Sequence, residues 1–135
     1  LHLQKQGLKL YAYVALENNL HIIPQSKQLN KDITRFKSYT ASQILLYLKQ
    51  NGVENILEQL AFYKKAHKSD REYQLWQEGI QPKLMQSDAM MVSKIKYIHD
   101  NPVQRVYIDE AKHWRYSSAR DYEGEDGLLD IERFW

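Results

Sequence analysis

Residues 87–103 read Ser-Asp-Ala-Met-Met-Val-Ser-Lys-Ile-Lys-Tyr-Ile-His-Asp-Asn-Pro-Val, and this stretch predicts an amphipathic helix. Ser87 is a favourable N-cap, and Asp88 lies in the first turn, where the helix dipole favours an anion. Tyr97 falls off the apolar stripe, and Pro102 is expected to end the helix. The apolar side chains of the stripe recur at helical spacing, at Met91, Ile95 and Ile98.

Tyr97 and Asn101 are four residues apart, so in a helix both side chains project from one face. His21 lies far upstream on a predicted strand. A phenol, a carboxamide and an imidazole could together provide a nucleophile and two metal ligands. Each residue also has an ordinary structural interpretation: a hydrogen-bonded strand histidine, a packing tyrosine, and an asparagine that favours a helix end. From the residues alone, both interpretations stay open.

The N-terminal part of the chain predicts two strands. Residues 10–16 alternate and are rich in aromatic and β-branched side chains, residues 17–19 form a turn, and a second strand begins at Leu20. Pro24 is expected to stop this second strand. His21 should therefore stand on a strand rather than in a loop.

Two helices should follow, over about residues 30–51 and 53–67, with Gly52 as the C-cap of the first. Short extended pieces are expected at 75–77 and 83–85. The sequence thus predicts an α/β fold, a small sandwich in a single domain over 1–135, with an acidic tail at about 120–135. The predicted inward-facing residues are Ile33, Phe36, Ile44, Leu45 and Leu48 in the first helix, and Ile56, Leu57, Leu60 and Ala61 in the second.

Composition restricts the chemistry. The chain has 135 residues, of which 43% are hydrophobic and 27% charged, as in ordinary globular domains. The absence of cysteine excludes a disulfide framework, a thiolate zinc site and a cysteine nucleophile. The apolar runs are too short for a membrane span and no leader pattern is evident, so we expect a cytoplasmic protein without a membrane partner.

Positive charge is concentrated in the first 119 residues, which carry 17 Lys and Arg against 11 Asp and Glu; residues 120–135 carry 2 against 6. Clusters at 27–49 and 64–71 attract phosphate, and the tyrosines between them could stack on unpaired bases. A solvated helix face is the simpler explanation of such clusters. The residues predicted to contact DNA are Lys31, Arg35, Lys37, Lys64 and Lys65.

Five segments resemble the single-tyrosine transposases of the HUH superfamily, in particular those associated with repetitive extragenic palindromes (REP). These segments occur in the same order as in the family and span most of the chain, which makes the resemblance specific. The segments are Tyr11–Val14 with Asn18–Ile23, Phe36–Ala41, Trp76–Gly79, Lys96–Val103 and Trp114–Arg120.

The resemblance implies a ferredoxin-like antiparallel sheet with helices packed on its faces, the metal motif on a central strand, and the tyrosine helix across it. It implies that Tyr97 is the nucleophile and that His21 and Asn101 hold Mg²⁺ or Mn²⁺. Such a protein, a monomer or homodimer, would bind single-stranded DNA or a palindromic hairpin. It would nick and rejoin the strand through a 5′-phosphotyrosine intermediate.

Asn19 occupies the position of the first histidine in the family's metal-binding pair, and Glu17 replaces a proline. An amide oxygen from Asn19 could replace the imidazole but is a poorer ligand, so we expect weak metal binding. The chain also opens at Leu1 without the strand that the family places first, which suggests a fragment or a decayed gene product. Two alternatives remain: a catalytically impaired protein that still binds DNA hairpins, and an unrelated α/β protein.

Overall fold

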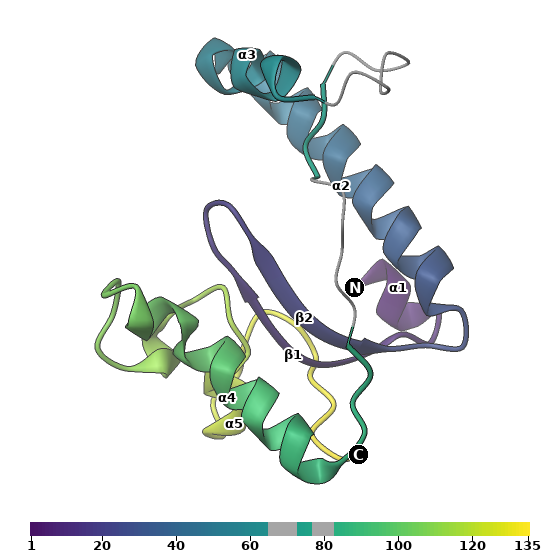
Figure 1. Ribbon diagram of the computed structural model, residues 1–135, viewed down its shortest axis with the longest axis vertical. Helices are drawn as coiled ribbons and strands as arrows, with labels where there is room; N and C mark the ends of the chain where they lie inside the picture. The colour runs from purple at the N-terminus through teal and green to yellow at the C-terminus, as the bar shows by residue number, and fades with distance from the viewer. Residues whose placement is uncertain (65–72, 77–82) are drawn as a thin grey trace. The chain divides into compact units, whose positions relative to one another are not determined.

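The computed structural model describes residues 1–64, 73–76 and 83–135. They divide into two compact units: residues 1–29 with 83–135, called here the sheet unit, and residues 30–82, called the helical unit. The sheet unit contains α1 (His2–Lys5), β1 (Lys9–Ala15), β2 (Leu20–Gln25), α4 (Asp88–Gln104), the 3₁₀ helix η2 (Ala111–His113) and α5 (Ala119–Tyr122) (Figure 1). The mixed α+β class predicted from the sequence is confirmed.

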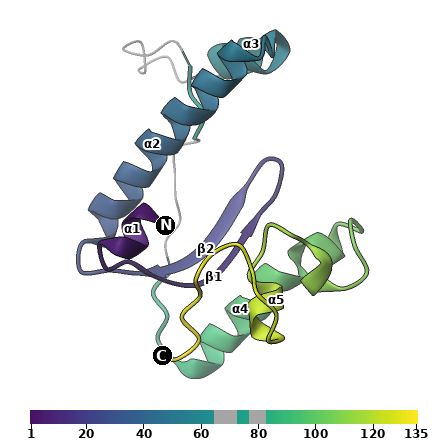
Figure 2. The ribbon, with the colours of Figure 1, turned by 180° about the vertical axis from the view of Figure 1, so that it is seen from behind.

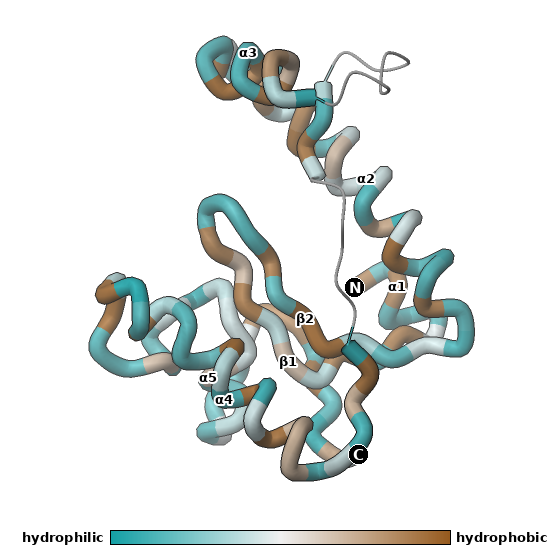
Figure 3. Tube along the Cα trace, viewed as in Figure 1, coloured by the Kyte–Doolittle hydropathy of each residue, from teal (hydrophilic) through white to brown (hydrophobic). Residues whose placement is uncertain are grey.

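In the sheet unit, β1 and β2 form an antiparallel hairpin whose turn is hydrophilic (Figure 3). Val14 also bridges to Ser117, so β1 lies between β2 and residues 116–118. Within the described residues β2 is therefore an edge strand, and the expectation that His21 stands on a central strand is wrong for this part of the chain. The expected stop at Pro24 is also wrong, because β2 continues to Gln25; an edge strand tolerates a proline whose missing N–H faces outward.

The helix α4 begins as predicted, with the Ser87 hydroxyl accepting a hydrogen bond from the Met90 amide at 3.1 Å. It does not end at Pro102, which is buried inside the helix, and it runs to Gln104. A Schellman pattern closes it, in which the amide of Val106 donates to the Val103 carbonyl and that of Tyr107 to the Pro102 carbonyl. Pro102 has no N–H to donate to the Ile98 carbonyl, so the helix lacks one hydrogen bond there.

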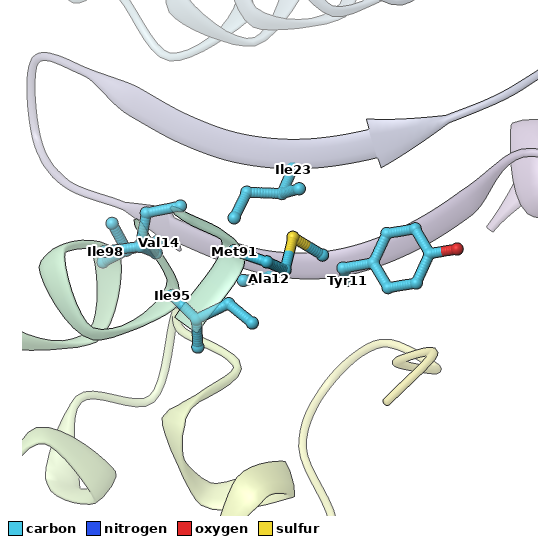
Figure 4. Close-up of a cluster of buried hydrophobic side chains, with 7 residues drawn as sticks. All are labelled: Tyr11, Ala12, Val14, Ile23, Met91, Ile95 and Ile98. Atoms are coloured by element: carbon cyan, nitrogen blue, oxygen red, sulfur yellow. The ribbon is translucent and has the colours of Figure 1, made fainter. Parts of the chain in front are cut away.

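The core lies between α4 and the hairpin (Figures 2 and 4). The predicted stripe of α4 is confirmed, because all three of its side chains are buried. Burial of these apolar surfaces is the main force that holds the tyrosine helix against the sheet. The core cluster consists of Tyr11, Ala12, Val14, Ile23, Met91, Ile95 and Ile98.

The helical unit contains α2 (Leu29–Gln50) and α3 (Glu54–Phe62). The first agrees closely with its predicted range, and Gly52 follows it at φ 64°. The second ends earlier than predicted, at Phe62, and residues 65–67 of the predicted range lie outside the described residues.

The inward-facing prediction holds for Leu48 and Leu57, which are buried, but Ile44 and Ile56 are 40% and 42% exposed. Residues 73–75 and 83–86 form no strand, so the extended pieces predicted at 75–77 and 83–85 are irregular where they are described. Trp76, from the predicted segment 76–79, donates its indole N–H to the Thr40 hydroxyl at 2.9 Å. The single-domain prediction stays a prediction.

Candidate functional site

The structure brings His21 and Tyr97 together. In the antiparallel register His21 pairs with Val14, and paired residues project to the same face of a sheet, here the face that packs against α4. Tyr97 lies beside the apolar stripe of α4 and remains 55% exposed. The two rings meet edge to face, with centroids 5.7 Å apart and planes at 90°. A nucleophile candidate and a ligand candidate from distant parts of the chain thus share one side of the sheet.

Two cations adjoin this ring pair. The Lys94 ammonium lies 5.5 Å from the Tyr97 ring centroid, which is a cation–π distance. Partial burial, and secondly the positive charge of Arg105, lower the pKa of His21 below its ordinary value of 6.5. The imidazole is therefore neutral at pH 7, so a ring nitrogen can present a lone pair, as metal ligation requires.

Asn101 and Asn19 are both half-buried. Asn101 lies one helical turn beyond Tyr97 on α4, as the spacing predicted. Asn19 immediately precedes β2, and its side-chain oxygen is buried without a hydrogen-bond partner in the described part of the chain. A buried amide oxygen left unpaired is costly, and it is a hard oxygen donor of the type that Mg²⁺ prefers. An imidazole nitrogen and amide oxygens are donor types that a divalent ion accepts, and among these four residues the observed contact is the one between His21 and Tyr97.

Arg105 is a candidate that sequence reasoning missed. It directly follows α4, and its guanidinium Nη1 lies 3.6 Å from the Glu17 carboxylate and 3.5 Å from the Asn18 amide oxygen. Tyr107 donates its hydroxyl to the same Glu17 carboxylate at 2.5 Å, which is the main reason that the pKa of Glu17 is lowered. The end of the tyrosine helix is thus tied to the turn that leads into His21. The only signal in the sequence is that residues 97, 101 and 105 are evenly spaced by four.

His99 is two residues from Tyr97 on α4, so its side chain projects away from that of Tyr97. It is buried, its Nε2 lies 2.8 Å from the Ser118 hydroxyl oxygen, and that hydroxyl also accepts from the Tyr13 amide at 3.0 Å. Ser118 belongs to the segment Trp114–Arg120, and in the same segment the Trp114 indole donates to the Ala15 carbonyl at 3.0 Å. These hydrogen bonds hold the segment against β1.

The basic residues predicted to contact DNA belong to the helical unit. Lys31 and Arg35 are exposed on α2, Lys37 is half-buried there, and Lys64 follows α3. Lys65 lies outside the described residues. Their role stays a prediction, as do the catalytic and metal-binding roles of Tyr97, His21, Asn101 and Asn19.

The chain is similar over 82 residues to a protein of Haemophilus influenzae named as a REP-associated tyrosine transposase. The two are 29% identical, and the match covers 60% of this chain and 47% of the relative. No family model and no solved structure matches the chain. This distant, partial similarity agrees with the family resemblance of the sequence motifs. No helix in the described ranges is long and apolar enough to cross a membrane.

Proposed function

We propose that this chain is a transposase-type protein that binds single-stranded or hairpin DNA and transfers strands through Tyr97. The observation that carries the proposal is the contact between the Tyr97 and His21 rings, 5.7 Å apart by their centroids, from two motifs that only the fold brings together. The similarity to a named tyrosine transposase supports the same assignment.

In the proposed reaction the Tyr97 hydroxyl oxygen attacks the scissile phosphorus. The P–O3′ bond breaks, the tyrosine keeps the 5′ phosphate, and the departing oxygen takes up a proton to become a 3′ hydroxyl, while the phenol proton is released to solvent. The phosphotyrosine bond conserves the energy of the original linkage. A 3′ hydroxyl can therefore reverse the step and rejoin strands without ATP.

The exposure of Tyr97 leaves its oxygen accessible to a DNA backbone. Lys94, whose ammonium lies 5.5 Å from the Tyr97 ring centroid, supplies positive charge beside it, which favours an approaching phosphate. His21, Asn101 and Asn19 are the residues proposed to hold Mg²⁺ or Mn²⁺. When bound, the ion would polarise the scissile phosphate and offset the charge that develops on it.

A labelled DNA hairpin tests the proposal. With Mn²⁺ present, the wild-type chain should form a covalent protein–DNA adduct that survives denaturing electrophoresis. Tyr97→Phe should abolish the adduct and leave hairpin binding unchanged, because it removes only the attacking oxygen. Tyr39→Phe, which removes the hydroxyl of a 68% exposed tyrosine in the helical unit, is the matched control and should retain the adduct. An adduct that persists in Tyr97→Phe would disprove the assignment.

Asn19 favours a second candidate, a protein derived from such a transposase that binds DNA hairpins but cuts them poorly. An amide oxygen in place of an imidazole binds Mn²⁺ less strongly. A salt-sensitive mobility shift with no adduct under any metal condition would support this candidate over the first.

A further inference from the structure

Three aromatic side chains, Tyr107, Trp114 and Tyr116, form a continuous ladder in the sheet unit. The Tyr107 and Trp114 rings are stacked, with centroids 5.6 Å apart and planes at 27°, and Tyr116 meets Trp114 edge to face at 6.4 Å. Tyr107 and Tyr116 remain 45% and 54% exposed, while Trp114 is half-buried. Since stacking covers one face of Tyr107, its exposed area must lie on the other face and the edges.

The ladder is fixed in place by hydrogen bonds. Trp114 donates its indole N–H to the Ala15 carbonyl at 3.0 Å, and the Ala15 amide donates to the Tyr116 carbonyl at 2.8 Å. At the other end, the Tyr107 hydroxyl donates to Glu17. Rings that are already ordered lose little conformational entropy when a ligand covers them, so this surface is prepared for binding.

The ladder also adjoins the candidate site. Ala15 forms hydrogen bonds with Trp114 and Tyr116 of the ladder. In the hairpin it pairs with Leu20, the residue before His21. Glu17, which accepts a hydrogen bond from Tyr107, lies 3.6 Å from Arg105, the residue that directly follows the tyrosine helix α4. The Arg105 charge offsets that of Glu17, so the carboxylate does not leave this surface acidic. The ladder and the candidate site are thus linked through β1 and through the turn at Glu17.

We propose that the aromatic ladder binds unpaired bases of a DNA single strand by stacking. The proposal rests on the proposed function in taking DNA as the partner, and it assigns the ligand of a surface outside the catalytic and metal-binding residues. Unpaired bases expose the ring faces that stacking on tyrosine and tryptophan needs, whereas a duplex hides them. The ladder would thereby favour single-stranded over paired DNA beside the cleavage site.

Tyr116→Ala tests the proposal in the full chain, because Tyr116 has an exposed ring and contributes only its backbone carbonyl to the β1 contact. Fluorescence anisotropy would measure the Kd for labelled oligothymidylate and for an abasic oligomer of equal length at fixed salt. Stacking of one base predicts that Tyr116→Ala weakens oligothymidylate binding by about 5-fold to 100-fold. Binding of the abasic oligomer should not change. Tyr116→Phe should bind as wild type, and Phe134→Ala, at an 81% exposed ring of the sheet unit, is the control for the loss of any exposed ring.

Equal weakening for both oligomers would overturn the proposal, since the loss would then not depend on bases. Unchanged binding in Tyr116→Ala, or a wild-type chain that does not distinguish the two oligomers, would overturn it as well. The hairpin adduct assay, run in parallel, distinguishes a failure of this proposal from a failure of the proposed function. If the adduct forms through Tyr97 but binding does not depend on bases, only the role of the ladder is rejected. If binding depends on bases but no adduct forms, only the proposed nuclease activity is rejected.

Discussion

His99 should make the folded protein sensitive to acid. It is only 9% exposed, and burial lowers its pKa from 6.5 to about 4, although the negative charges of Asp100 and Glu123 act in the opposite direction. Between these two values the unfolded chain binds a proton that the folded protein does not, so stability falls as the pH falls from about 6.5 toward 4. Over this pH range the free energy of unfolding should fall by about 3 kcal/mol, a large part of the stability of a small domain.

Urea unfolding of the wild type and of His99→Gln at pH 7 and pH 4 measures the contribution of His99 to the pH dependence of stability. Glutamine cannot take up a proton, and its amide can still reach a hydroxyl such as that of Ser118, 2.8 Å from the histidine ring. The wild type should lose about 3 kcal/mol more than the variant between the two pH values. Other titrating groups, including His21, change the free energy of unfolding equally in both proteins, so their effects cancel when the two are compared. The same pH dependence in both proteins would refute the assignment of a buried neutral imidazole at His99.

Three further predictions concern the backbone, the basic surface and the metal site. Val106 adopts φ 61° and is 88% exposed, so Val106→Gly should raise the free energy of unfolding by about 1 kcal/mol, as measured by thermal unfolding. Gln104→Gly, at an exposed helical position, is the control and should lower it by about as much. Replacing one phosphate-contacting cation with alanine should reduce the slope of log affinity against log salt by about one; unchanged slopes throughout would assign these cations to a solvated surface. Asn19→His should raise both Mn²⁺ affinity by calorimetry and hairpin cleavage; if neither changes, His21 is not a ligand or the site has decayed further. The cations to be replaced singly are Lys31, Arg35, Lys37, Lys64 and Lys65.

The sequence predicted the features that depend on neighbours along the chain. The Ser87 cap and the apolar stripe of α4 follow from local hydrogen bonding and helical periodicity, and both are present. The hairpin before α2 was predicted for the same reason, from alternation and a polar turn. Pro24 was misjudged because the rule against proline in strands holds for central strands, and the position of β2 at an edge is a property of the whole sheet.

The contacts of the candidate site depend on residues far apart in the sequence, and these were predicted less completely. The meeting of His21 with Tyr97 followed only from the family resemblance, since neither residue alone distinguishes a ligand from a packing group. The four-residue spacing from Asn101 to Arg105 is a local signal, but it does not indicate that Arg105 contacts Glu17. The exposure of Ile44 and Ile56 shows the same limit, because helical periodicity identifies an apolar stripe but not whether another element covers it.

The continuation of α4 through Pro102 determines which side chains can reach the hairpin. Positions four residues apart in a continuous helix lie along one ridge, so Tyr97, Asn101 and Arg105 succeed one another along α4. Had the helix ended at Asn101, the local geometry that sets Arg105 against the turn, 3.5 Å from Asn18, would not exist. Pro102 has no N–H to donate to the Ile98 carbonyl, while the Schellman closure satisfies the carbonyls of Pro102 and Val103. The continuation beyond Pro102 gives the tyrosine helix a second attachment to the hairpin that carries His21.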